Sequence, residues 1–357
     1  MRIVVAMSGG VDSSVAAALL AEQGHDVIGV SMQLYDQSQT DTAGARAFGT
    51  CCTIDDLYDA RRVAATIGIP HYSVNFESQF GDHVVSNFVN EYIAGRTPIP
   101  CSHCNSDLKF AELLDRAKAF GAETLATGHY ARVERDADGR YHLYRGADNS
   151  KDQTYFLFSL TQEQLARAAF PVGHLDKDTV RAHALRLKLR VANKPDSQEI
   201  CFVPDGDYAA FVERSAPAAT RPGTVVSNDG RVLGTHEGVH RFTIGQRKGL
   251  GLSSREPLYV LEIKPDTAQV VVGSRDELGR GSLSASGVNW VSGEAAHDWR
   301  LVSAQIRHRH TAARARVRAI ADGRAEVAFD APQTAVTPGQ AVVFYEGEEV
   351  IGGGWID

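Results

Sequence analysis

The chain has 357 residues, which is enough for two or three domains of ordinary size, each with a core of its own. Its 43% hydrophobic and 23% charged residues are typical of a globular protein and exclude a disordered or fibrous chain. The formal net charge of −7 excludes a nucleic-acid binder that is basic throughout, although not one with a local basic surface. No apolar run reaches the ~20 residues of a membrane span and the N-terminus lacks a signal-peptide layout, so we expect a cytoplasmic protein.

Over the first two hundred residues, short apolar segments alternate with helical patterns. A glycine follows several of the expected helices, at the position past a helix end where a left-handed conformation is common. Alternating strands and helices predict an α/β fold, with a parallel sheet wrapped by helices. The expected elements are strand 2–7, helix 13–23, strand 25–32, helix 55–67, strand 71–76, helix 107–120 and strand 124–127.

After Pro195 the pattern changes, because glycine and β-branched residues become frequent and long helical periods disappear. Short strands with tight turns are expected over 221–272, and a second junction near 279–281. Strands at 315–320, 325–329 and 341–345 then predict a small β-barrel. We therefore predict three domains: a parallel-sheet domain, a small, mostly β central domain and a C-terminal β-barrel domain. Their expected bounds are 1–200, 201–280 and 281–357.

The first strand is followed by a loop suited to binding phosphate. Glycines allow the backbone to approach an anion closely, and hydroxyl groups and the N-terminus of the next helix offer hydrogen-bond donors. Asp12 would repel a bare phosphate, which suggests a Mg²⁺ ion between carboxylate and polyphosphate. The alternative is that these are ordinary turn and N-cap residues, and neither a Walker loop nor a G-x-G-x-x-G occurs in the chain. The loop comprises Ala6, Met7, Ser8, Gly9, Gly10, Val11, Asp12 and Ser13.

All five cysteines precede residue 202, and in a cytoplasmic chain we expect them to be reduced thiols. Cys104 is expected in a loop just ahead of the 107–120 helix, whose N-terminus would favour a reactive thiolate. Cys201 follows a polar segment at the expected domain boundary. The adjacent Cys51 and Cys52 are interpreted as loop or wall residues, since neighbouring side chains rarely converge on one metal.

Two further patterns concern metals and polyanions. The sequence from His236 to His240 matches H-E-x-x-H, but Gly238 interrupts it and strand and turn residues follow, so we reject a zinc-protease helix. In the C-terminal region, seven arginines lie from Arg300 to Arg324 with few acidic residues, which indicates a surface for a polyanion or, alternatively, a solvated face of a strand. They are residues 300, 307, 309, 314, 316, 318 and 324.

The segment S-G-G-x-D-S at positions 8–13 resembles the PP-loop of the ATP pyrophosphatases, which activate an oxygen as an adenylate and release pyrophosphate. Further segments together resemble the tRNA-specific 2-thiouridylase family, in the order of that family and over nearly the whole chain. They are G-R-T-P at 95–98, C-N at 104–105, T-G-H-Y at 127–130, K-D-Q at 151–153, S-Q-E-I-C-F at 197–202, F-T-I-G-Q-R-K-G-L-G at 242–251 and P-G-Q at 338–340.

The resemblance implies ATP-dependent 2-thiolation of uridine 34, the wobble position, of tRNA. In the family, the cysteine matching Cys201 carries a persulfide whose outer sulfur attacks the adenylated C2. The cysteine matching Cys104 completes the transfer and leaves a disulfide between the two. The family further implies tRNAs for Lys, Glu and Gln as substrates, and a sulfur-relay protein or a cysteine desulfurase as donor.

The same resemblance implies binding residues. Besides the loop, Met32 and Gly128 are expected against the nucleotide, because ligands of open α/β sheets lie beyond the carboxyl ends of the strands. The residues expected to contact tRNA are Ile99, Pro100, Cys101, His129, Lys151, Asp152, Gln153, Arg307, His308 and Gln340.

One departure from the family affects the mechanism. The usual loop T-P-N-P-D-x-x-C-N here has Ile99 in place of Asn and Cys101 in place of Asp. The substitution creates a Cys-x-x-Cys pair, so that Cys101, Cys104 and Cys201 offer three thiolates for a [4Fe-4S] cluster that delivers sulfide, as an alternative to the persulfide. The residues also leave open an amide-forming synthetase of the same fold and an RNA-binding module with a vestigial loop.

Overall fold

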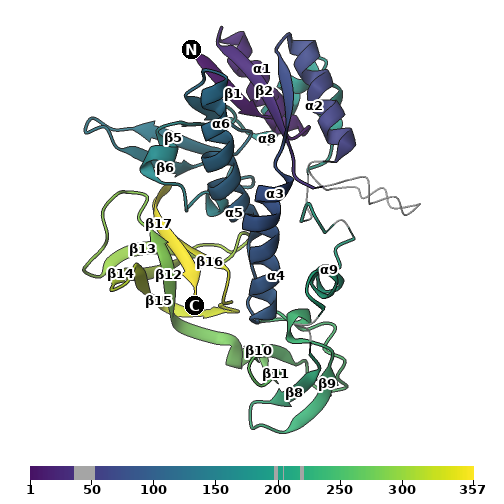
Figure 1. The fold of residues 1–357 in the computed structure, drawn as a ribbon. Coiled ribbons are helices and arrows are strands. Elements are labelled where there is room, and N and C mark those ends of the chain that lie inside the picture. The colour runs from purple at the N-terminus through teal and green to yellow at the C-terminus, as the bar shows by residue number, and fades with distance from the viewer. Residues whose placement is uncertain (36–52, 197–199, 204, 218–220) are drawn as a thin grey trace.

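The computed structural model describes residues 1–35, 53–196, 200–203, 205–217 and 221–357 (Figure 1). A five-stranded parallel sheet forms the centre of the N-terminal region, in the order β3-β2-β1-β4-β7. The strand order reverses at β1, so that the carboxyl ends of β1 and β4 border the same crevice. The strands are β1 (Arg2–Ala6), β2 (Asp26–Gln33), β3 (His71–Asn75), β4 (Thr124–Ala126) and β7 (Ala168–Ala169).

Helices cover both faces of this sheet because alternate residues of its buried strands point to opposite sides. On β1, Ile3 and Val5 pack with α1 (Val11–Glu22), α2 (Ile54–Ile67) and α8 (Lys177–Arg186). Val4 and Ala6 face the opposite core, which contains the remaining long helices. They belong to two runs: α3 (Glu77–Phe80), η2 (Gly81–Val85) and α4 (Ser86–Ile93), then α5 (Pro100–His103), η3 (Cys104–Leu113) and α6 (Leu114–Ala119).

The second of these runs corrects the expected helix 107–120. The helix begins at Pro100, which occupies its first turn and needs no hydrogen-bond donor there, and it continues through the π-helical segment η3 to Ala119. Cys104 therefore lies within the helix and not in a loop before its N-terminus. The prediction that Cys104 precedes a helix N-terminus that activates its thiol is therefore wrong.

The central region and the barrel confirm the expected change to β-structure. Four strands form the central sheet, in the order β10-β11-β8-β9, with β8 (Gly223–Ser227), β9 (Val232–His236), β10 (Tyr259–Lys264) and β11 (Gln269–Gly273). Pairing of β12 with both β15 and β17 closes six strands into a barrel. These are β12 (Gly279–Asn289), β13 (Arg300–Gln305), β14 (Ala313–Ile320), β15 (Arg324–Thr334), β16 (Ala341–Glu346) and β17 (Glu349–Ile356).

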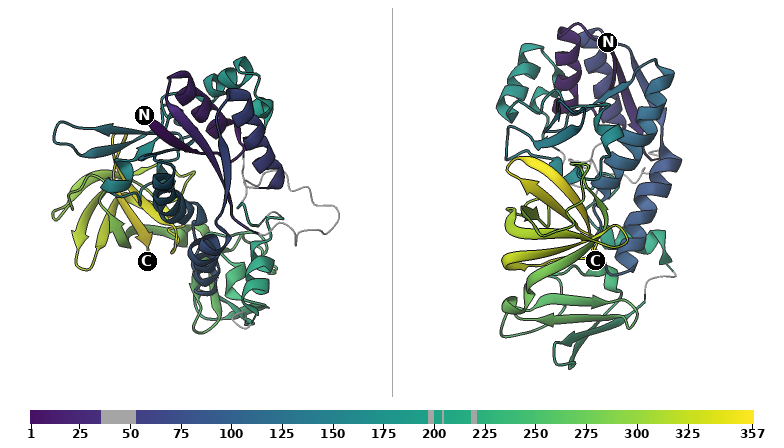
Figure 2. Two further views of the ribbon diagram at one scale, coloured as in Figure 1. Left: turned by 45° about the horizontal axis from the view of Figure 1, so that its top comes forward. Right: turned by 90° about the vertical axis from the view of Figure 1, so that its left-hand side faces the viewer.

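A hairpin from the N-terminal region extends the barrel sheet, which the sequence did not predict. Its strands β5 (Ala131–Arg135) and β6 (Tyr141–Arg145) follow β4 directly, and β6 pairs with β17 at Tyr144 and Glu349. Figure 2 shows the barrel between the parallel sheet and the central β region. The hairpin thereby joins the first part of the chain to its last strand.

The remaining elements are short. They are η4 (Thr154–Phe156), α7 (Gln162–Leu165), η5 (Arg190–Asn193), α9 (Tyr208–Ser215), η7 (Val239–Arg241) and η8 (Arg275–Leu278). His236 ends strand β9 and His240 lies in the 3₁₀ turn η7, so they do not share a helix face and the zinc-protease interpretation stays rejected. In the part of the chain that the structure describes, no helix is long and apolar enough to span a membrane.

Candidate active site

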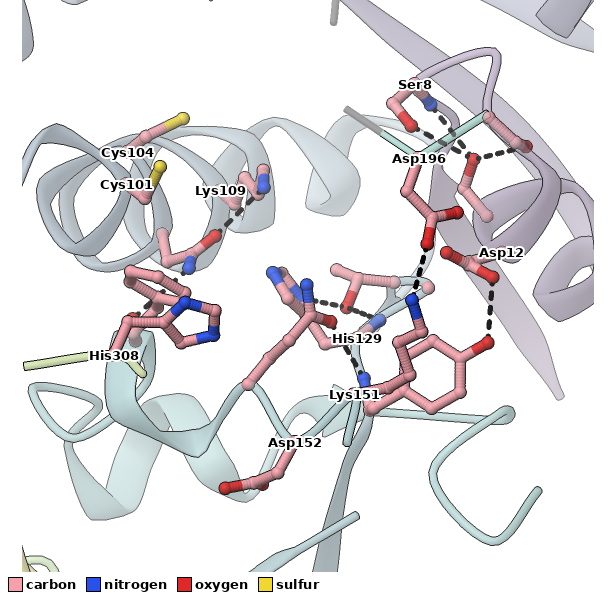
Figure 3. A pocket seen from close by; sticks show the side chains of 18 of the residues that line it. Ser8, Asp12, Cys101, Cys104, Lys109, His129, Lys151, Asp152, Asp196 and His308 are labelled. Atoms are coloured by element: carbon pink, nitrogen blue, oxygen red, sulfur yellow. Dashed lines mark hydrogen bonds and ion pairs between the residues drawn. The ribbon is translucent and has the colours of Figure 1, made fainter. Parts of the chain in front are cut away.

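A cavity of about 1140 Å³ lies where the carboxyl ends of β1 and β4 face the Pro100–Leu113 helix and the barrel. Most of the loop residues expected to bind ATP line it, together with Met32 and Gly128. Cys101, Cys104 and Cys201 line it as well. Figure 3 shows the two helical cysteines at one end of the cavity and Asp12 at the other. The sequence-predicted nucleotide and sulfur sites thus share one space.

Close backbone contacts fix the phosphate-binding loop. Gly9 has a φ of +73°, and a Cβ at this residue would lie 2.2 Å from the carbonyl oxygen of Asp56 at the start of α2. This contact turns Gly9 away from the cavity, which it does not line. On the other side, a Cβ at Gly128 would lie 2.4 Å from the backbone nitrogen of Ser13. Only glycine fits at these two positions, because both neighbours are backbone.

Within the loop, the hydroxyl of Ser13 organises the turn. Its Oγ accepts a hydrogen bond from the backbone N–H of Ser8 at 3.2 Å and lies 3.3 Å from the Ser8 Oγ. Gly10 precedes α1 in an extended conformation, and no side chain caps this helix end. The N-terminus of a twelve-residue helix therefore faces a cavity with its first N–H groups available for an anion.

Three lysines from later parts of the chain surround the loop, and the sequence predicted only Lys151. The Lys177 Nζ lies 2.8 Å and 2.9 Å from the two carboxylate oxygens of Asp12. The Lys194 Nζ donates to the carbonyl oxygen of Gly9 at 3.1 Å and pairs with Asp56 at 2.6 Å. No spacing in the sequence points to these lysines, since Lys177 follows Asp12 by 165 residues.

Asp196 connects two of the lysines. One carboxylate oxygen lies 2.6 Å from the Lys177 Nζ and the other lies 2.8 Å from the Lys151 Nζ. Burial raises the pKa of Asp196, but the hydrogen bonds and charges of the two lysines outweigh this effect and lower it overall. The carboxylate is therefore ionised at neutral pH and holds both ammonium groups at the wall of the cavity.

Tyr130 completes the surroundings of Asp12. Its hydroxyl donates to Asp12 Oδ1 at 2.9 Å, and burial followed by the Asp12 charge raises the pKa of this phenol. The Asp12 carboxylate thus already contacts one ammonium and one hydroxyl group. A Mg²⁺ ion bound to Asp12 would therefore share this carboxylate with the Lys177 ammonium group, which largely balances its charge.

At the opposite end of the cavity, the helix that carries Cys101 and Cys104 is held by apolar packing. Leu108 and Leu113 are fully buried, and Cys104 packs against the same core. Next to Cys104, the Asn105 side chain donates to the carbonyl oxygen of Phe156 at 3.2 Å and accepts from the Lys109 Nζ at 2.9 Å. Cys104 is half-buried, whereas Cys101 is exposed.

The position of Cys201 is set by the residue that follows it. Phe202 is buried, with edge-to-face contacts to Phe80 at 5.5 Å and Phe88 at 5.0 Å between ring centroids. Such aromatic pairs fix ring orientation as well as burying area. Anchoring of Phe202 places Cys201 on the cavity wall.

The iron–sulfur alternative does not fit these positions. Among the residues described, no group of three or more His, Cys, Asp or Glu side chains lies close enough together to hold a metal ion. We therefore derive no step through a cluster. The predictions for Cys51 and Cys52 lie outside the described residues, as does part of the S-Q-E-I-C-F segment.

The structure brings six of the ten residues expected to contact tRNA to the cavity wall besides Cys101. These are Pro100, His129, Lys151, Asp152, Gln153 and His308. Asp152 is engaged within the protein, since its carboxylate pairs with Arg145 at 2.5 Å and its side chain is only 6% exposed. The Arg145 guanidinium also lies 3.6 Å from the ring centre of Tyr345 on β16. This contact links the hairpin to the barrel.

The other three residues lie elsewhere. Ile99 is buried in the apolar core, which explains why an apolar residue stands where the family has Asn. The Arg307 guanidinium donates to the carbonyl oxygen of Thr334 at 3.0 Å. The Gln340 amide donates to the carbonyl oxygen of Thr97 at 2.9 Å, and so ties the barrel to the segment before the cysteine helix. None of the three lines the cavity.

His129 is a neutral group in the cavity wall. Burial lowers its pKa well below the ordinary value, and the Lys109 charge acts in the same direction. Its Nδ1 lies 2.6 Å from the Thr127 hydroxyl, which orients the ring. At neutral pH the neutral ring has one donor and one acceptor nitrogen, and because Nδ1 is engaged by Thr127, Nε2 is the nitrogen left for a hydrogen bond to a ligand.

Comparisons with known proteins cover the whole length. Three family models match consecutive parts of the chain: a "tRNA methyl transferase HUP domain" at 1–205, a "tRNA methyl transferase PRC-barrel domain" at 209–274 and an "Aminomethyltransferase beta-barrel domain" at 280–356. Among curated proteins, the tRNA-specific 2-thiouridylase MnmA of Solibacter usitatus is 56% identical, with 99% of each chain covered. The proteins of the same description from Geotalea uraniireducens and Geobacter metallireducens are 53% and 54% identical, cover all of this chain and are themselves covered to 95% and 96%.

Proposed function

The chain belongs to the family of the tRNA-specific 2-thiouridylases, and on that premise we propose that it is an ATP-dependent sulfurtransferase that forms 2-thiouridine at position 34 of tRNA. The observation that carries this function is the shared cavity, in which the phosphate-binding loop, Cys104 and Cys201 line one space. The description of the matching family model names methyl transfer. A loop for ATP phosphates and a pair of thiols are instead the equipment for activation followed by sulfur transfer.

The proposed reaction begins with activation of the base. The loop from Ser8 to Ser13 binds the polyphosphate of ATP, with Met32 and Gly128 against the nucleotide. The C2 oxygen of the uridine attacks the α-phosphorus, and pyrophosphate leaves. Mg²⁺ belongs to this proposal as the counter-ion of the phosphates, with Asp12 as the carboxylate of the loop. Bound there, the ion would add positive charge where pyrophosphate develops.

Sulfur transfer follows at the other end of the cavity. The outer sulfur of a persulfide on Cys201 attacks C2. The Cys104 thiolate then attacks the Cys201 sulfur and breaks the S–S bond of the persulfide. The electron pair of that bond forms the C2=S bond, AMP leaves with the former C2 oxygen, and a Cys104–Cys201 disulfide remains. A thiol reductant must reduce this disulfide before the next turnover.

The partners belong to the same proposal. Substrates are the tRNAs for Lys, Glu and Gln, and the donor is a sulfur-relay protein or a cysteine desulfurase, in the cytoplasm where tRNA is modified. His129, Lys151, Gln153 and His308 contact the anticodon region from the cavity wall. Arg307 acts at the barrel surface by its charge, so tRNA affinity falls with salt and in Arg307→Glu.

The experiment compares Cys201→Ser with the unchanged enzyme on unmodified tRNA, ATP and a persulfide donor. We expect the variant to release pyrophosphate in the presence of tRNA while 2-thiouridine disappears from the nucleosides measured by mass spectrometry. Undiminished thiolation in Cys201→Ser would overturn the persulfide route. Absence of tRNA-dependent pyrophosphate release from the unchanged enzyme would overturn the activation step.

A further inference from the structure

The phosphate-binding loop has no cationic residue of its own. Its only charged side chain is Asp12, which alone would repel the polyphosphate of ATP. Loops that contain a lysine at this position use its ammonium to neutralise the outer phosphates. The same requirement exists here, because the first N–H groups of α1 supply only a partial positive charge.

Lys177 is placed to meet that requirement. It is the first residue of α8, where Asp176 caps the helix by accepting from the Thr179 N–H at 2.7 Å. The backbone N–H of Lys177 donates to Asp148 at 3.2 Å. Its side chain is 10% exposed and ends among Asp12 and Asp196, on the wall of the cavity. Helix, cap and two carboxylates therefore hold one ammonium group beside the loop.

The position of Lys177 along the cavity indicates which phosphates of ATP it would contact. The α-phosphorus must face the base and the cysteines, so the departing pyrophosphate points toward the opposite end. Figure 3 shows Asp12 and Asp196 at that opposite end, away from Cys101 and Cys104. Lys177 contacts both carboxylates and therefore lies where the outer phosphates belong.

The other two lysines are less suited to this role. Lys194 contacts Gly9 through its carbonyl oxygen and pairs with Asp56 and with Asp59 at 2.8 Å, so it fastens the loop to α2. Lys151 pairs with the second oxygen of Asp196 and is 34% exposed. Lys177 alone among the three contacts the carboxylate of the loop itself.

We propose that Lys177 binds the β- and γ-phosphates of ATP and stabilises the departing pyrophosphate, with Asp12 and Asp196 as the residues that position its ammonium group. The inference rests on the proposed function, since it assigns a residue to the ATP site of that reaction. A lysine 165 residues beyond the loop thus supplies the charge that other phosphate-binding loops carry within themselves.

The test compares the affinities of the purified full-length protein for ATP and AMP by calorimetry, without tRNA. Loss of a charge-assisted hydrogen bond changes affinity by about ten- to a hundredfold. We expect Lys177→Met to weaken ATP binding by about that factor and AMP binding by less than about threefold, because AMP lacks the outer phosphates. Lys177→Arg retains the charge and is expected to bind ATP within about tenfold of the unchanged protein.

Lys118→Met is the matched control, because Lys118 is exposed on α6 and outside the cavity. Equal weakening of ATP and AMP in Lys177→Met would show a structural support and overturn the inference, as would unchanged ATP binding. If Lys177→Met does not fold, Lys177→Gln keeps a polar side chain beside Asp12 and Asp196 without the charge, and it must still show the selective loss for ATP. Failure of the unchanged protein to bind ATP would contradict the proposed function instead.

Discussion

At the end of the cavity near Asp12, charged side chains from distant parts of the chain hold one another in place, whereas near Cys104 and Cys201 the walls are held by apolar packing. Lys177, Asp196 and Lys151 form the first arrangement. Leu108 and Phe202 belong to the second. Both ends need fixed geometry, but the forces that fix it differ.

The difference follows from what each end must do. The phosphates of ATP are negatively charged, and further negative charge develops on the departing pyrophosphate. Ammonium groups that can pair either with carboxylates or with phosphates therefore suit the ATP end. In the proposed route, Cys201 carries a persulfide, a reactive sulfur that must be kept from water and from other thiols, so an apolar wall suits the cysteine end. Changes to the charged groups at the ATP end are therefore expected to affect stability and nucleotide binding together, whereas changes to the thiols at the cysteine end are expected to affect sulfur transfer alone.

The largest effect on stability is expected for Gly9→Ala. The new methyl group would overlap the Asp56 carbonyl oxygen, and the alanine would have to keep the left-handed conformation of Gly9, at a combined cost of about 2 to 4 kcal/mol. Gly24→Ala is the matched control, since Gly24 has a φ of +81° but no atom within 4 Å of the added carbon. Thermal unfolding and ATP binding are to be measured for both. Equal losses of stability would show that conformation, and not the contact with α2, decides.

Lys194→Met tests the ionic support of the loop. It leaves Asp56, whose side chain is 7% exposed, without its ammonium partner, at a cost of about 1.5 to 3 kcal/mol in the free energy of unfolding. Lys118→Met removes an ion pair in which both side chains are more than half exposed, and we expect no measurable loss there. Chemical denaturation measures both. Similar values for the two variants would contradict a structural role of Lys194.

The stability of the protein at acid pH tests the lowered pKa of His129. Its pKa is lowered in the folded protein, so below about pH 6.5 the unfolded chain binds a proton that the folded chain does not. Folding stability then falls with decreasing pH, by up to about 1.4 kcal/mol per pH unit from this one group. As the pH falls from 7 to 5, we expect the unfolding free energy of His129→Gln to decrease less than that of the unchanged protein. His71, His236, His308 and His310 also have lowered pKa values, and they cancel in this difference.

The smallest effect is expected for Cys101→Ser. Cys101 is exposed on the same helix as Cys104, and the persulfide route does not use it. We expect thiolation of tRNA within about twofold of the unchanged enzyme, a difference near the limit of resolution. Quantitative nucleoside analysis after anaerobic purification measures it, with iron analysis of the same sample. An iron-loaded protein that loses thiolation on this change would restore the cluster alternative.

The sequence predicted those features whose signals are local. A strand, a glycine-rich turn and a helix in succession indicated the loop from Ala6 to Ser13, and long family segments indicated Cys104 and Cys201, which line the same cavity as that loop. The helix before Cys104 was missed because Pro100 and two cysteines are poor helix signals, although proline is favoured in a first turn. Lys177 and Lys194 were missed because nothing near them in the sequence names their partners.

The roles of residues that contact other parts of the protein and not a ligand were also hard to predict. Ile99 departs from the family and was expected near the base, yet burial in the core explains its apolar side chain. Asp152 and Gln340 lie in family segments, but the structure shows their side chains bonded to Arg145 and Thr97. A motif identifies a residue that matters, whereas only the fold distinguishes a group that holds its neighbours from one that meets a ligand.

The pairing of the hairpin with β17 has a consequence for how the protein assembles. Tyr144 on β6 pairs with Glu349 on β17, so the hairpin can join the barrel sheet only after β17, near the end of the chain, has been synthesised. At Gly353 in this strand, a Cβ would lie 2.7 Å from the ring of Phe158. The strand therefore packs directly against the Phe158 ring, with no side chain in between. Contacts so distant along the chain form late, because closing a long loop costs entropy before the pairing repays it. The parallel sheet is then able to fold while the chain is still growing, and the wall formed by Arg145 and Tyr345 comes last. A half-made chain would have its nucleotide loop but no finished chamber in which to activate a base.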